Sequence, residues 1–118
     1  MPHTFKNIKI WEKAHSLVLN IYKITEIFPH HEKYGLTSQL RRAASSIPTN
    51  IVEGYKRRTK KDFAHFLNIA ETSLEEVKYL LFLSLELGFL REPVFNKVTP
   101  LTDELGRMMF GFKKTLTA

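Results

Sequence analysis

The stretch DFAHFLNIAETSLEEVKYLLFLSLELG, residues 62–88, decides the fold because its apolar residues recur in steps of three and four. This spacing predicts one long amphipathic helix with a continuous apolar seam. The seam consists of Phe63, Leu67, Ala70, Leu74, Val77, Leu81 and Ser84. Thr59, with Asp62 three residues later, resembles a capping box that begins the helix. Gly88 followed by Phe89 predicts its C-terminal cap.

The same spacing predicts three more helices. The first runs from about Ile8 to Phe28 and is stopped by Pro29, with a seam of Ile10, Ala14, Leu17, Ile21, Ile24 and Phe28. The second, capped by Thr37, has one face formed by Leu36, Leu40, Ala44, Ile47 and Ile51. The fourth has Pro93 in its first turn and directs inward Val94, Val98, Leu101, Leu105, Met108 and Phe112.

Two prolines fall inside these predicted helices. Pro48 removes one backbone hydrogen bond, so the second helix is expected to be kinked, and Pro100 is expected to bend or restart the fourth. No linker or repeat divides the chain, and the connections between helices are short. The prediction is an all-α protein in which residues 1–118 form a single domain, an antiparallel up-down four-helix bundle.

Residues 79–87, YLLFLSLEL, are apolar on nearly every side of the predicted helix. A helix in a lone bundle shows one face to water, so another subunit is expected to cover this segment. Apolar residues that flank the seam of the first helix also indicate a contact with another subunit. The expected interface is Trp11, Val18, Tyr22, Tyr79, Leu80, Phe82, Leu83 and Leu87. The alternative is that the termini, or the loop from Pro29 to Gly35, fold over these side chains.

Composition narrows the possible functions. The chain has 118 residues, no cysteine and a net charge of +6. Disulfides and cysteine chemistry are therefore excluded, and a basic protein favours anionic partners, nucleic acid before an acidic protein or a membrane surface. No signal peptide or membrane-spanning segment is evident, so we expect a cytoplasmic protein.

Catalytic and metal-binding signals are weak. Glu12 and His15 form an E-x-x-H pair, as in di-iron bundles, but both are predicted to point away from the seam. His30 and His31 are adjacent in a loop and lack further ligands. No nucleotide-binding or hydrolase motif occurs. We therefore expect neither enzyme activity nor a metal or cofactor.

The remaining feature is a basic segment, residues 41–61, which holds seven basic residues and one acidic residue, Glu53. Its charge of +6 equals that of the whole chain. Because the second and third helices meet here, most of these charges are expected to gather at one end of the bundle. Such a surface suits phosphates, although an ordinary solvated helix corner is the alternative. The candidate nucleic-acid-binding residues are Arg41, Arg42, Lys56, Arg57, Arg58, Lys60 and Lys61.

The stretch YGLTSQLRRAASSIPTNIVEGYKRRTKKDFAHFLNIAETSLEEV, residues 34–77, resembles the bacterial four-helix bundle family of 23S rRNA intervening-sequence proteins, or S23 proteins. IKIWEKAH, residues 8–15, is similar too. Four arginines fall on basic positions of the family: Arg41, Arg42, Arg57 and Arg58. Its central motif is matched by Gln39, Ser46, Pro48, Asn50, Glu53 and Gly54. Glu71 departs from the pattern, since family members often have glycine there.

The family is also similar to the accessory variability determinant proteins of diversity-generating retroelements. The resemblance implies a homopentamer that binds RNA or DNA through a basic surface and, in the retroelement branch, a reverse transcriptase. Two hypotheses follow: a non-enzymatic, homo-oligomeric nucleic-acid-binding bundle, or a protein-interaction scaffold for a polymerase-like partner such as a reverse transcriptase.

Overall fold

The structure is a computed structural model that describes residues 5–117. Four α-helices make up most of it: α1 (Lys9–Thr25), α2 (Leu36–Tyr55), α3 (Lys60–Glu86) and α4 (Glu92–Thr117). Short 3-10 turns precede α1 (η1, Phe5–Asn7) and α2 (η2, His30–Glu32). Helix α1 ends before the expected Phe28, which is part of the connection to α2 and is buried.

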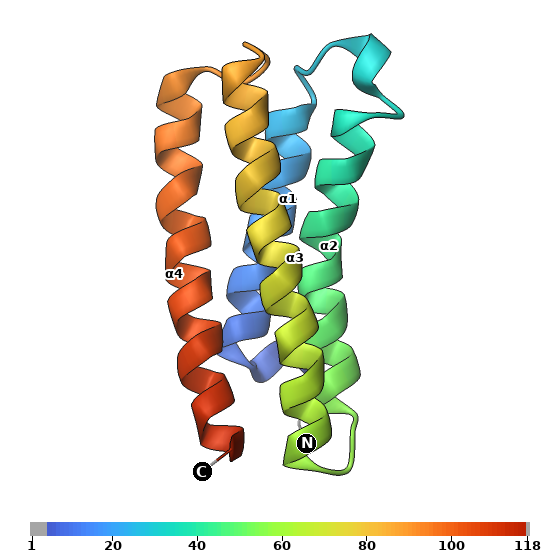
Figure 1. Cartoon of the computed structure of the whole chain (residues 1–118), viewed down its shortest axis with the longest axis vertical. Helices are drawn as coiled ribbons and strands as arrows, with labels where there is room; N and C mark the ends of the chain where they lie inside the picture. The colour runs from blue at the N-terminus through green and yellow to red at the C-terminus, as the bar shows by residue number, and fades with distance from the viewer. Residues whose placement is uncertain (1–4, 118) are drawn as a thin grey trace.

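The four helices run up, down, up and down, and together form an elongated bundle of 43 × 24 × 22 Å (Figure 1). Each helix packs against the helices next to it in the chain, and α4 closes the bundle against α1. Helices α1 and α3 therefore lie diagonally opposite each other, as do α2 and α4. The predicted all-α four-helix bundle is confirmed.

The core follows the predicted seams in α1, α2 and α3, but the prediction for α4 was partly wrong. Thr102 and Met109 are buried, whereas Leu101 is 38% exposed and Met108 is only partly buried. Thr102 tolerates burial because its hydroxyl donates a hydrogen bond to the Thr99 carbonyl at 2.8 Å. Leu101 is thereby left facing outward beside α1.

Both internal prolines lie within continuous helices. Helix α2 passes through Pro48, whose side chain is buried, and α4 passes through Pro100. Helix α4 therefore does not restart at Pro100, and the other expectation, a bend there, stays a prediction. Adjacent turns and the packing on neighbouring helices hold each helix together across the missing hydrogen bond.

Helix ends were predicted with mixed success. The Thr59 hydroxyl accepts a hydrogen bond from the Asp62 amide at 3.1 Å, as expected. Gly88 (φ 80°) ends α3, and the Gly88 and Phe89 amides donate to the carbonyls of Leu85 and Ser84. Thr37 does not cap α2. The Glu32 carboxylate accepts from the Leu36 amide at 2.9 Å instead, because η2 brings it to the helix start.

Candidate nucleic-acid interface

The turn between α2 and α3 carries five of the seven predicted nucleic-acid-binding residues. Tyr55 ends α2 and Lys60 begins α3, so the intervening backbone must reverse direction within four residues. Residues 56–61 are all exposed. We call this end of the bundle, where α1 begins, α2 and α3 meet and α4 terminates, the basic end. Its turn residues are Lys56, Arg57, Arg58, Lys60 and Lys61.

Most of these turn cations have no partner. Lys56, Arg58, Lys60 and Lys61 make no ion pair or side-chain hydrogen bond in the part of the chain that the structure describes. Arg57 is the exception: its guanidinium lies 3.4 Å from a Glu53 carboxylate oxygen and 4.5 Å from the centre of the Phe66 ring. Four positive charges are therefore open to solvent on one turn, where a phosphate backbone can reach them.

Close packing of apolar groups fixes the shape of this turn. Gly54 is buried at the next-to-last position of α2, and a Cβ there would lie 2.6 Å from Cδ1 of Phe63 and 3.0 Å from Cβ of Phe66. Only a residue without a side chain lets α3 approach α2 so closely. The glycine that matches the central motif of the resemblance therefore positions the basic turn.

Arg41 and Arg42 do not join the basic end. They lie in the first half of α2, and the fifteen residues from Arg42 to Arg57 correspond to about 22 Å along a helix. Arg41 is used within the chain: its guanidinium donates to the Thr25 hydroxyl at 2.8 Å and to the Tyr22 carbonyl at 3.3 Å, and it covers the Tyr22 ring. Most of the seven charges were expected to gather at one end, and Arg41 and Arg42 are the two that do not.

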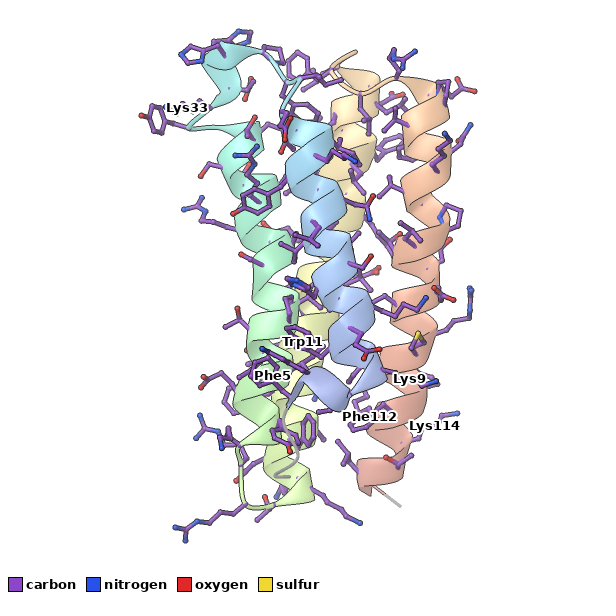
Figure 2. All side chains as sticks on the ribbon, turned by 180° about the vertical axis from the view of Figure 1, so that it is seen from behind. Phe5, Lys9, Trp11, Lys33, Phe112 and Lys114 are labelled. Atoms are coloured by element: carbon purple, nitrogen blue, oxygen red, sulfur yellow. The ribbon has the colours of Figure 1, made fainter. Side chains whose placement is uncertain are left out.

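Four lysines from distant parts of the sequence reach the basic end instead. They are Lys6 in η1, Lys9 at the start of α1, and Lys113 and Lys114 near the end of α4. Figure 2 places Lys9 and Lys114 at the same end and Lys33 at the opposite end. The predicted up-down order already implies this meeting of helix ends, so the lysines were foreseeable from topology combined with charge.

These added lysines are not equivalent. Lys113 donates to the Glu71 carboxylate at 2.6 Å and to the Asn68 side-chain oxygen at 2.9 Å, which joins α4 to α3. Lys114 lies 4.6 Å from the centre of the Phe110 ring. Glu71, where the family pattern often has glycine, therefore forms a partly buried link between helices in this chain.

Hydroxyl and amide groups of the central motif serve the α2–α3 contact. The Ser46 and Ser73 hydroxyls are 2.9 Å apart across the two helices, and the Asn50 amide donates to the Ser46 hydroxyl and carbonyl. Because these polar groups form hydrogen bonds with one another, they fix the register of α2 on α3.

Only part of the predicted oligomer interface lies on the surface. Leu80 is 4% exposed and belongs to the core. Val18 and Leu83 are half-buried against the core, as is Trp11, which stacks on His15 and meets the edge of Phe5 from η1. The N-terminal turn therefore covers Trp11, as the alternative proposed. The exposed members are Tyr22, Tyr79, Phe82 and Leu87.

Residues considered for catalysis or metal binding lie on the surface. Glu12 and His15 are exposed, as are His30 and His31 at the opposite end from the basic turn. Within residues 5–117, no three histidine or acidic side chains lie close enough together to hold a metal ion. No helix in the same range has the length and apolar character needed to cross a bilayer.

Fold and site together define a class: a small all-α up-down bundle with a strongly basic end. The chain belongs to the 23S rRNA-intervening sequence protein family, whose model matches residues 6–111. It is similar to a solved protein of unknown function from the S23 ribosomal protein family of Bacteroides thetaiotaomicron VPI-5482. The TM-score is 0.79 and the identity 21%, over 89% of this chain and 98% of that one, and this likeness shows the fold alone. No curated protein matches the chain.

Proposed function

We propose that this protein is a non-enzymatic, homo-oligomeric bundle that binds RNA or DNA through its basic end. The observation that carries the proposal is the set of exposed cations without partners on the α2–α3 turn, Lys56, Arg58, Lys60 and Lys61. Lys6 from η1 and Lys9 at the start of α1 enlarge the same surface. Unpaired cations at one end of a rigid bundle attract a polyanion at little cost, since no internal ion pair has to break.

The chemistry of this surface favours phosphates over base edges. Lysine and arginine side chains neutralise phosphates and release counterions, which makes binding salt-dependent but carries no sequence information. The aromatic side chains at the turn, Tyr55, Phe63 and Phe66, are all partly buried, and Phe66 is covered by the Arg57 guanidinium. We therefore expect binding that depends on the shape and charge of the nucleic acid more than on its sequence.

The test replaces Arg58, Lys60 and Lys61 by Ala and measures affinity for a structured RNA at several salt concentrations. The slope of log K against log salt is expected to become shallower by about three, with about a hundredfold loss of affinity at 0.1 M salt. The control removes Lys33 and Arg91, exposed cations at the opposite end, and should leave both values unchanged. Unchanged affinity in the triple variant, with an unchanged melting temperature, overturns the proposal.

Self-association is proposed from the aromatic and aliphatic side chains that the bundle leaves exposed. Tyr79, Phe82 and Leu87 remain at least half exposed on α3 although they lie beside a full core. Covering them with other copies removes this surface from water, and the resemblance implies five copies. Light scattering on the native chain tests this, and a well-folded monomer over the micromolar range would contradict it.

A further inference from the structure

Helices α1 and α4 are the least closely packed neighbours in the bundle, and an open hollow of about 480 Å³ lies between them. Its walls include Ile24 from α1, Ile27 just after that helix, and Val94 and Leu101 from α4. Ile27 is 67% exposed and Leu101 is 38% exposed, so the apolar lining meets water. We call this hollow the α1–α4 groove.

Two lysines stand at the sides of the groove. Lys23 lies on α1 and Lys97 on α4, and neither makes an ion pair in residues 5–117. The acidic side chain nearer the middle of the same seam, Glu104, is already engaged by Lys13 at 3.3 Å. The groove therefore suits an occupant with an apolar centre and acidic flanks.

The outer face of α3 has this composition. Tyr79 and Phe82 are 60% and 50% exposed, and acidic residues stand on either side of them along the helix. Glu86 makes no ion pair in the described chain, while Glu75, whose side chain is 71% exposed, pairs with Lys78 at 3.1 Å. We call this face, Glu75 to Leu87, the α3 ridge; it is about 18 Å long.

Ridge and groove lie at the same level of the molecule but face different directions. The ridge occupies the second half of α3, and the groove is formed by the second half of α1 and the first half of α4. In an up-down bundle these segments share one end, opposite the basic end (Figure 1). Because α1 and α3 are diagonal, one copy cannot fill its own groove, whereas a second copy placed alongside at the same height can.

We infer that the partner in the α1–α4 groove is the α3 ridge of another copy of this chain. Glu75 and Glu86 of one copy then approach Lys23 and Lys97 of the next, around an apolar centre of Tyr79, Phe82, Ile27 and Leu101. Such a contact is heterologous, and repetition by rotation closes it into a ring with all basic ends on one face. The inference rests on the self-association in the proposed function and specifies its interface.

Complementation between two defective variants tests this arrangement. Y79D/F82D damages the ridge, and I27D/L101D damages the groove; all four side chains are surface-exposed, so both variants should fold by circular dichroism. Each alone is expected to be monomeric by light scattering. Mixed together they should form a dimer, because one intact ridge meets one intact groove, but nothing larger. Failure of the mixture to associate overturns the inference.

Charge exchange gives a second test that leaves the apolar centre intact. K23E/K97E is expected to weaken association at least tenfold, and K23E/K97E/E75K/E86K to restore it, since every copy then carries both reversed faces. E26K and K33E, on exposed residues outside both surfaces, serve as controls. If the native chain associates but neither variant changes the association, the interface is wrong while the proposed function stands. If the native chain is monomeric, both the proposed interface and the proposed self-association fail.

Discussion

The two ends of the bundle use charged side chains in opposite ways. At the end where α1 finishes and α2 begins, Arg41 closes the last turn of α1 and Glu32 caps α2. At the basic end the α2–α3 turn is held by Gly54 against two phenylalanines and by the Thr59 cap, and Lys56, Arg58, Lys60 and Lys61 of that turn take no part. The first end therefore uses charge for stability, while the α2–α3 turn leaves four of its five cations without a partner in the described chain.

Basic residues at the two ends of α2 differ in how firmly the fold holds their side chains. Arg41 and Arg57 lie on the same helix or at its end, yet the first is fixed by two hydrogen bonds and the second by one exposed ion pair and a ring contact. Removing Arg41 should therefore change the free energy of unfolding, whereas removing the unpaired cations of the α2–α3 turn should change the proposed binding.

The largest expected effect on stability comes from Gly54→Val. The new side chain would overlap Phe63 and the Cβ of Phe66, so we expect a loss of about 2–3 kcal/mol in the free energy of unfolding. Urea denaturation at fixed protein concentration measures this. The matched control is Gly111→Val on α4, where an added Cβ meets nothing within 4 Å and stability should hardly change. Equal effects at both glycines would contradict the packing argument.

Next in size is Arg41→Ala. It removes hydrogen bonds to the Thr25 hydroxyl and the Tyr22 carbonyl, and we expect a loss of about 1–2 kcal/mol in the free energy of unfolding. Thermal and urea melts should show the change, while RNA affinity of the folded variant should stay close to that of the native chain. Arg42→Ala, in the exposed neighbouring position, is the control and should not alter the melt. If Arg41→Ala keeps its stability but binds RNA more weakly, Arg41 belongs to the binding surface and does not stabilise the fold.

A smaller loss is expected for Thr59→Ala. This change removes the acceptor for the Asp62 amide at the start of α3, at a cost of about 1 kcal/mol. Thr59→Ser keeps the hydroxyl and should retain most of the stability in the same melt. If Ala and Ser behave alike, the cap does not contribute to holding the basic turn.

The smallest expected effects on stability are those of two adjacent substitutions, Arg57→Ala and Arg58→Ala. Arg57→Ala loses the ion pair with Glu53 and the contact with the Phe66 ring, both partly solvent-exposed, for about 0.5 kcal/mol. Arg58→Ala should leave the melting temperature unchanged, because Arg58 has no partner in the described chain. Salt titrations should show a shallower slope for Arg58→Ala. An unchanged slope would remove Arg58 from the binding surface.

Sequence alone determined the four helices, the seams of α1 to α3, the caps of α3 and the basic turn. These features depend on residues three or four apart, and helix geometry fixes their relations locally. The same local rule misplaced Leu101 and Thr102, because their burial depends on how α4 rotates against α1.

Tertiary structure alone decided which charges are free and which apolar residues are covered. Arg41 and Arg58 look alike in the sequence, but docking gives the first a partner on α1 and leaves the second in solvent. Leu80 and Phe82 stand two residues apart, and only the packing of the helices buries one and exposes the other. The α1–α4 groove likewise exists only once the helices dock, because its walls come from opposite ends of the chain.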